Sequence, residues 1–412
     1  MHLYLRVGIV YFGPVRANIK NSEEEPMKLK RMLAIILCAA ILSCATYGCK
    51  TDTEDASPLD PPSENGNPSD GAVADNYRQS VDFDAAFSAF APDTVMIVAG
   101  EFEVTWAKLF FLLCSSISSM ISAFGAFPDL SLTVSDGITY AEALLDSAVE
   151  YALHYLALEY GAMVLGVTLN EEELEMLNAN YEDLVEMYGG EEPLCELIWR
   201  NSGIYDLELF LHLLYLNYLP LSILYSMFGQ DGELVSDEDV SEFAADEGYL
   251  MAKHILRMKT EDNDEAPRVE IEDVLLRLNN YDGDDLEGFF DELMFEYSED
   301  SGGLSMFPDG YLFQLGDMQE SFCEAAAALE IGAYSGIVET ENSYDIILRL
   351  PLDYDAVPIA SLIVGDDTPL RIITAVYLFD MAIAEWRDSL LPVFTAEFES
   401  IDIETLFVLR ED

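Results

Sequence analysis

Side chains that could carry out nucleophilic or metal chemistry are sparse in this sequence of 412 residues. It has six cysteines without a CxxC pair, and its four histidines are too scattered for the ligand spacing of a zinc site. The sequence therefore predicts no metal ion and no cofactor. Met318 and Phe322 are four residues apart, so on a helix they would share one face and could grip an apolar group.

The residues around this pair predict a compact α+β unit. Tyr249 to Leu256 has the composition of a strand, and the Ala-rich run from Met318 to Leu329 indicates a helix. The other elements expected here are helices over 271–280 and 286–295, and strands over 310–314, 337–340 and 344–350.

The flanking segments predict an all-helical region. Its expected helices cover 140–165, 169–188 with Thr168 and Glu171 as a capping box, 207–228 interrupted by Pro220, and a short helix opened by Ser236. The tail over 368–407 returns to helical periodicity. Two stretches, 109–128 and 209–230, carry no charge and could be membrane spans. Their serines, glycines, proline and histidine favour mutually packed core helices, or an apolar cradle for unfolded clients, over membrane spans.

The first fifty residues indicate export and lipid anchoring. Lys28, Lys30 and Arg31 precede an apolar run over 32–42 of secretory length. Cys44 follows Ile-Leu-Ser, which resembles a bacterial lipoprotein processing site, and Cys49 is the alternative lipidated residue. We therefore expect residues 27–49 to be a lipoprotein signal peptide, preceded by a non-native extension over 1–26. A flexible acidic linker is expected over 50–84.

The balance of charge excludes one class of partner. The chain has 78 Asp and Glu against 19 Lys and Arg, a net charge of −59. Such a surface repels phosphate groups, so nucleic-acid binding is excluded.

Four segments, in order, resemble a parvulin-type peptidyl-prolyl isomerase domain: AKHIL (252–256), FFDELMFEYSEDSGG (289–303), PDGYLFQLGDMQESFCEAAAAL (308–329) and GAYSGIVETENSYDIILRL (332–350). With the lipoprotein signal and the helical flanks, the arrangement is similar to extracytoplasmic PrsA-like and SurA-like foldases. The resemblance implies a small antiparallel sheet with surrounding helices over 246–352. This domain would be inserted in a helical chaperone domain in which 353–412 packs on 85–245.

The resemblance also implies which residues form the site. His254 matches the first active-site histidine of the family, Asp300 matches the position beside the substrate carbonyl, and Thr340 matches a threonine that hydrogen-bonds the histidine pair. The substrate-binding residues implied are Phe313, Met318, Gln319 and Phe322.

The chain departs from the family at Asp345, where a second histidine is usual. Asp345 can still accept a hydrogen bond from His254. It also places a second carboxylate near Asp300, which is expected to raise the pKa of one of the two. Asp345 therefore predicts weak isomerase activity.

These expectations give one leading function and one alternative. The leading function is a membrane-anchored peptidyl-prolyl cis/trans isomerase and foldase, acting outside the cytoplasm on unfolded exported proteins with Xaa-Pro bonds. Such isomerisation crosses a barrier of about 20 kcal/mol and needs no cofactor. The alternative is a non-catalytic holdase chaperone with a degenerate parvulin domain.

Overall fold

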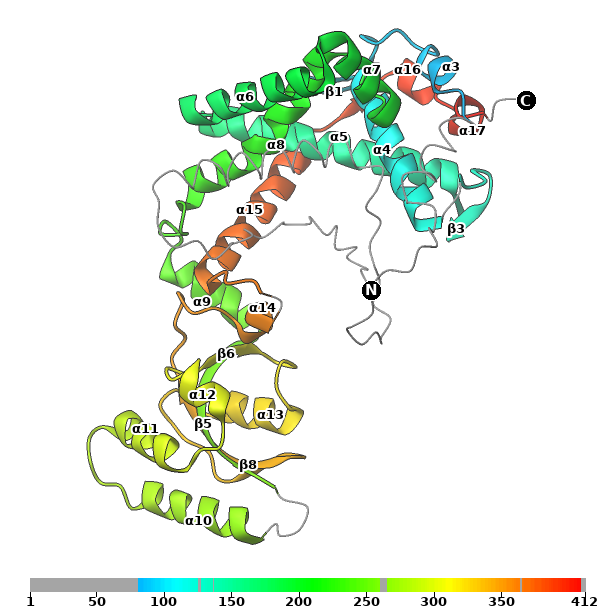
Figure 1. Cartoon of the computed structure of the whole chain (residues 1–412). Coiled ribbons are helices and arrows are strands. Elements are labelled where there is room, and N and C mark those ends of the chain that lie inside the picture. The colour runs from blue at the N-terminus through cyan, green and yellow to red at the C-terminus, as the bar shows by residue number, and fades with distance from the viewer. Residues whose placement is uncertain (1–80, 125–126, 136, 260–264, 364, 409–412) are drawn as a thin grey trace. The chain divides into compact units, whose positions relative to one another are not determined.

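The computed structural model describes residues 81–408, except 125–126, 136, 260–264 and 364 (Figure 1). The predicted extension, signal peptide and lipidated cysteines lie outside the described residues. Contacts divide the chain into two units. Unit 1 contains Met227–Phe379, and unit 2 contains the described residues up to Ser226 together with those from Asp380 onward.

Unit 1 is built on a four-stranded antiparallel sheet with the strand order β6-β5-β8-β7. The central strands β5 (Tyr249–Met258) and β8 (Ser343–Leu350) pair along nearly their whole length, from Met251 opposite Leu350 to Met258 opposite Ser343. The edge strands are β6 (Tyr311–Gln314) and β7 (Val338–Glu339). The predicted strands of this region are confirmed.

Helices cover both faces of this sheet (Figure 1). On one face, apolar residues such as Ile255, Ile346 and Leu348 pack against α10 (Glu265–Asn279) and α11 (Leu286–Tyr297). On the other face, residues such as Ile347 pack against α13 (Glu320–Ala328). Because side chains alternate along a strand, His254, which lies opposite Ile347, belongs to the α13 face.

The start of α13 differs from the prediction. Met318 and Gln319 precede the helix, with Gln319 as its N-cap, so Met318 and Phe322 do not share a helix face. The chain turns after β6, where Gly316 has φ +108° and the Asp317 carboxylate accepts the Gln314 backbone N–H at 2.8 Å. This turn delays the helix, since both its φ angle and its carboxylate contact favour non-helical backbone. Met318 still packs against the apolar cluster that contains Phe322.

Unit 1 is larger than the predicted segment 246–352. It also contains α9 (Asp237–Asp246), which Ser236 caps as predicted, α14 (Ile359–Ile363) and the first part of α15 (Leu370–Ser389). Arg371 of α15 bonds Asp237 at 2.9 Å, and the rings of Phe243 and Tyr377 are 4.9 Å apart. These contacts connect α9 and α15 directly.

Unit 2 contains a three-stranded sheet, so the prediction of an all-helical region for this part of the chain is wrong. The hairpin of β1 (Val95–Ala99) and β2 (Phe102–Thr105) pairs with β9 (Val393–Phe394) in the order β2-β1-β9. A short hairpin of β3 (Thr133–Ser135) and β4 (Ile138–Thr139) precedes α5. The β1–β9 pair brings together residues almost 300 positions apart, which local periodicity does not reveal.

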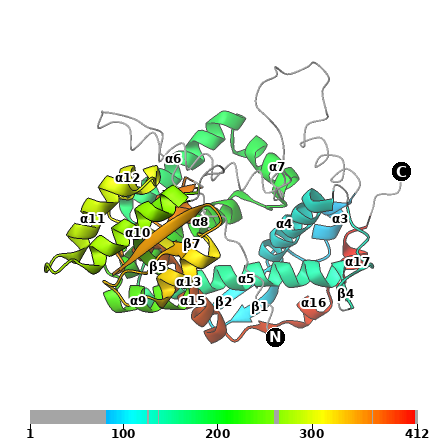
Figure 2. The same cartoon turned by 90° about the horizontal axis from the view of Figure 1, so that it is seen from below.

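The long helices of unit 2 lie where the sequence predicts them. α4 (Trp106–Phe124) packs beside α5 (Tyr140–Leu165) (Figure 2). They are followed by α6 (Glu171–Tyr188), α7 (Glu191–Ser202) and α8 (Leu207–Phe228). α8 continues through Pro220 without interruption. Burial of Leu216, Leu219 and Ile223 on both sides of the proline outweighs the roughly 3 kcal/mol that an interior proline costs.

The predicted capping box of α6 is wrong by two residues. Asn170, rather than Thr168, accepts a backbone N–H, and its partner is Glu173 rather than Glu171. The Asn170 side chain accepts the Glu173 N–H at 3.0 Å, and the Glu173 carboxylate accepts the Asn170 N–H at 2.8 Å. Both pairs have the capping-box spacing, and asparagine is the better N-cap.

Both ends of the described chain pack in unit 2. α3 (Phe83–Phe87) follows the buried Val81, so the predicted linker 50–84 extends too far into folded structure. α16 (Ala396–Glu399) and α17 (Ile403–Leu406) end the described chain. Phe407 contacts the rings of Phe83 and Phe110, with centroids 5.8 and 6.0 Å apart.

α8 is the one helix among the described residues that is long and apolar enough to cross a membrane. In its most apolar window, 44% of the residues are buried inside the structure. A core helix meets the same criteria of length and composition, so this feature is weak evidence for membrane insertion.

Candidate functional site

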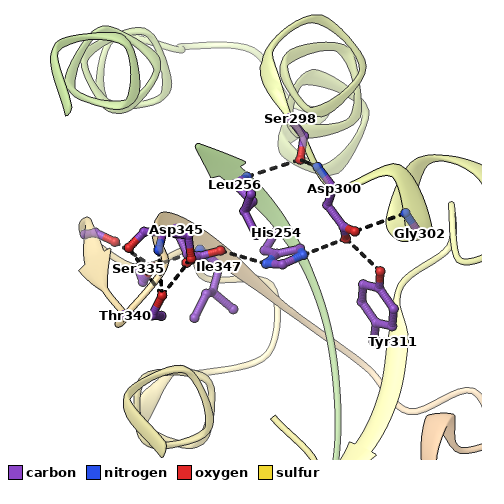
Figure 3. A network of polar contacts seen from close by, with 12 residues as sticks. His254, Leu256, Ser298, Asp300, Gly302, Tyr311, Ser335, Thr340, Asp345 and Ile347 are labelled. Carbon is purple, nitrogen blue, oxygen red and sulfur yellow. Dashed lines mark hydrogen bonds and ion pairs between the residues drawn. The ribbon is translucent and has the colours of Figure 1, made fainter. Parts of the chain in front are cut away.

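The centre of the site is His254, whose imidazole lies between two carboxylates (Figure 3). Nδ1 of His254 is 2.9 Å from Oδ1 of Asp345, and Nε2 is 2.7 Å from Oδ2 of Asp300. β5 and β8 position His254 and Asp345 on the same face of the sheet. The sequence-based expectation that Asp345 bonds His254 is confirmed.

The side chain of Asp300 is fixed by two further contacts. It is the N-cap of α12 (Ser301–Ser305), where its Oδ1 accepts the Gly302 N–H at 3.1 Å. Its Oδ2 accepts the Tyr311 hydroxyl at 2.7 Å (Figure 3). Sequence analysis missed Tyr311. Its position two residues before Phe313 on a strand is the signal that could have found it, because such residues share one face of the sheet.

The second carboxylate oxygen of Asp345 also accepts a hydrogen bond. Ser343 donates its hydroxyl to Oδ2 of Asp345 at 2.5 Å, and the Thr340 and Ser343 hydroxyl oxygens are 2.7 Å apart. The prediction that Thr340 hydrogen-bonds the histidine position directly is therefore wrong. Ser343 lies two residues before Asp345 on β8. Its hydroxyl therefore reaches the carboxylate and separates Thr340 from it. Sequence analysis missed Ser343 as well.

The electrostatic consequence is a charged histidine. Burial alone would lower the pKa of His254, but the hydrogen bonds with Asp300 and Asp345 outweigh it and raise the pKa to about 9. Burial raises the pKa of Asp300, and the hydrogen bonds from His254 and Tyr311 outweigh that effect and hold it well below its usual range. Burial and the bond to Asp300 both raise the pKa of Tyr311.

For Asp300, the expected rise in carboxyl pKa is wrong. The two carboxylates lie on opposite sides of the imidazole, so the imidazolium between them screens their repulsion. No group of three or more His, Cys, Asp or Glu side chains in the described part of the chain is arranged to hold a metal ion.

An apolar wall lies against the imidazole. The ring of Phe322 meets His254 edge-on, with centroids 5.2 Å apart, and Phe313 packs behind Phe322 at 5.7 Å. Phe313 has no exposed surface, so it supports the wall from within. Met318 is half-buried against the same cluster, and Gln319 is exposed and accepts the Glu341 N–H at 3.2 Å.

Access to the site is through Asp300 and Met318. The side chain of Asp300 is 18% exposed, whereas those of His254 and Asp345 are 10% and 1% exposed. On the α13 face, the carboxylate of Asp300 and the half-buried Met318 are therefore more exposed than the imidazole.

No family model and no curated protein matches this chain. Solved structures do match it. PrsA of Bacillus subtilis is 19% identical with a TM-score of 0.22, covering 64% of this chain and 93% of that one. A peptidylprolyl isomerase, PrsA of Bacillus cereus, is 16% identical with a TM-score of 0.28, covering 66% and 96%. A SurA-like chaperone of Campylobacter jejuni is 17% identical with a TM-score of 0.22, covering 63% and 96%.

Proposed function

We propose that this protein catalyses cis/trans isomerisation of Xaa-Pro bonds and assists the folding of exported proteins outside the cytoplasmic membrane. One observation carries the proposal. A buried imidazole is held between two carboxylates beside an aromatic wall, and the half-buried Met318 packs on that wall. This arrangement offers an apolar surface for a proline ring next to a fixed negative group.

The chemistry of rotation fits these groups. Resonance in the planar amide places negative charge on the carbonyl oxygen, and twisting the C–N bond removes it. A carboxylate beside that oxygen raises the free energy of the planar amide more than that of the twisted one. An Xaa-Pro carbonyl next to Asp300, with its ring on Met318, which packs on the cluster of the buried Phe322, would therefore rotate faster than in water.

The same contacts limit the expected rate. His254 and Tyr311 already donate to Asp300, which neutralises much of its charge, and both imidazole nitrogens are engaged. We therefore propose weak isomerase activity, with Asp345 as its cause, because it holds the imidazole in the charged form.

Cis/trans exchange of a short Xaa-Pro peptide, measured by NMR with and without the full chain, tests the proposal. Met318→Ala is expected to lower the exchange rate, since it removes the accessible part of the apolar wall. Met187→Ala is the matched control, because Met187 is exposed on α6 in unit 2. Equal exchange rates in the two variants would overturn the assignment of Met318 to the proline-binding surface.

Replacing Asp345 by histidine restores the residue usual in the family. Two neutral imidazoles would share a hydrogen bond without a second carboxylate, so Asp345→His is expected to raise the exchange rate. An unchanged or lower rate in this variant would show that Asp345 does not limit catalysis.

The alternative function is a non-catalytic holdase, and Asp345 is the observation that favours it. In that case the wild type and Asp345→His would both lack exchange activity, while the full chain would still suppress aggregation of an unfolded protein. Measuring aggregation and exchange on the same preparation distinguishes the two functions.

The proposed location rests on the sequence of the first fifty residues. Lipidation of Cys44 would anchor the chain to the outer surface of the bacterial cell membrane. Cys44→Ala is expected to block processing, with Cys49→Ala as the matched control. A reversed result would assign the lipid to Cys49, and processing unaffected by either change would exclude a lipoprotein.

A further inference from the structure

Unit 2 has a cavity of about 620 Å³ that is wide open to solvent and lies far in sequence from the residues of the isomerase site. Its walls come from α3, from α7 and from the segment that leads into α8. The side chains that matter for its chemistry are of two kinds, aromatic and acidic: Phe87, Trp199, Tyr205, Glu191, Glu192 and Glu196.

The aromatic side chains form one continuous cluster. The ring of Phe87 stacks on that of Tyr205 with centroids 5.1 Å apart, and it meets Trp199 edge-on at 5.0 Å. The indole N–H of Trp199 donates to Asp84 at 3.1 Å, which fixes the orientation of the ring. Tyr205 is 45% exposed and Trp199 is half-buried, so both rings offer surface to a ligand.

The acidic side chains give the cavity a single sign of charge. Glu191, Glu192 and Glu196 all lie on α7, and none of the residues that line the cavity is basic. Tyr181 donates its hydroxyl to Glu191 at 3.0 Å, which holds one of the three carboxylates in place. Carboxylates beside exposed aromatic rings attract a cation that has an apolar stem.

We propose that this cavity binds a basic side chain, arginine in preference to lysine, of an extended client peptide. The planar guanidinium stacks on Trp199 or Tyr205 while it pairs with Glu192 or Glu196, and its methylene stem lies on the aromatic cluster. The cavity is larger than one side chain and so takes neighbouring apolar residues of the peptide too. This proposal rests on the client-binding part of the proposed function and does not depend on isomerase activity.

The test uses the full chain and a peptide without proline, acetyl-Gly-Ser-Arg-Leu-Ser-Gly-amide, in a calorimetric titration at low salt. The peptide in which citrulline replaces arginine keeps the shape and removes the charge. We expect the arginine peptide to bind at least about fivefold more tightly than the citrulline peptide. Equal affinity would overturn the proposal.

Variants of the protein locate the binding. Glu192→Gln with Glu196→Gln is expected to weaken binding of the arginine peptide about fivefold or more. Glu175→Gln with Glu182→Gln, on α6, removes the same charge from residues outside the cavity and is the matched control. An equal loss in both double variants would show a general effect of net charge and would overturn the proposed site.

Met318→Ala separates this proposal from the proposed function. It changes the isomerase site in unit 1, so it is expected to leave binding of the proline-free peptide unchanged. If Met318→Ala abolishes binding and the α7 double variant does not, the peptide occupies the isomerase site and the cavity proposal is wrong. Absence of isomerase activity in the wild type, with intact arginine-dependent binding, would contradict only the proposed catalysis.

Discussion

At the scale of single residues, the charge of His254 depends on its two carboxylate partners. The pKa of His254 is raised from 6.5 to about 9, because Asp300 and Asp345 accept hydrogen bonds from both of its ring nitrogens. The imidazole is therefore an imidazolium throughout the neutral range. In a pair of neutral histidines, one nitrogen would remain available as an acceptor.

Asp345→Asn tests this electrostatic assignment. The change keeps the shape of the side chain and removes one of the two negative charges, so the pKa of His254 is expected to fall from about 9 toward 6.5. Histidine ring resonances followed by NMR against pH give the value, and the chain has only four histidines to assign. Asp273→Asn on α10 is the control. A pKa that stays near 9 would show that Asp345 does not cause the raised pKa of His254.

The same shift predicts how stability depends on pH. A group whose pKa is raised on folding stabilises the fold fully below its unfolded pKa, and this contribution is lost as the pH rises through its folded pKa. For His254 the loss falls between pH 6.5 and about 9, and its size is about 3 kcal/mol. Asp300 acts in the opposite sense, since its lowered pKa gives stability that is lost as the pH falls below about 4.

Urea unfolding of the full chain at several pH values measures this dependence. The wild type is expected to lose free energy of unfolding between pH 6.5 and 9 relative to His254→Gln. His212→Gln, which changes a histidine of α8 outside this site, is the control. Parallel curves for the wild type and His254→Gln would contradict the prediction.

At the scale of elements, the start of α6 shows how two matching patterns compete. Thr168 with Glu171 and Asn170 with Glu173 both have capping-box spacing, and the structure uses the second pair. The choice shifts the helix start by two residues, so Leu169 and Asn170 precede α6.

Asn170→Ala is expected to lower the free energy of unfolding by about 1 kcal/mol, because it leaves the Glu173 N–H without its acceptor. Thr168→Ala, at an exposed position, is expected to have almost no effect. Denaturant unfolding of both variants gives the comparison. A larger loss in Thr168→Ala would restore the capping box expected from the sequence.

At the scale of the whole molecule, the chain forms two units, and the second is assembled from both ends of the described chain. β9 pairs with β1, and Phe407 packs on Phe83 and Phe110. Unit 1 has its own sheet with an apolar cluster on each face. A unit with its own core is expected to fold without the rest of the chain.

A fragment of residues 227–379 is therefore expected to unfold cooperatively. A shorter fragment of residues 246–352 is expected to be less stable, because it lacks the contacts of Arg371 with Asp237 and of Phe243 with Tyr377. Thermal unfolding followed by circular dichroism compares the two. Failure of the longer fragment to fold would show that unit 1 depends on unit 2, and equal stability would support the narrower boundaries.

The sequence alone determined the features that depend on local pattern. The apolar runs of β5 and β8, the periodicity of α5 and the cap of α9 are each encoded within a few neighbouring residues, so their positions were predicted closely. The resemblance of four ordered segments also identified His254, Asp300 and Asp345 before their geometry was known.

Only the tertiary structure decided the features that join distant residues. Tyr311 reaches Asp300 because β6 pairs with β5, and Ser343 separates Thr340 from Asp345 because β7 and β8 turn tightly there. Met318 lies before α13 rather than on it, since the turn after β6 competes with helical periodicity. Strand pairing and side-chain contacts across the fold leave no periodic signal in the sequence, so their outcome depends on packing.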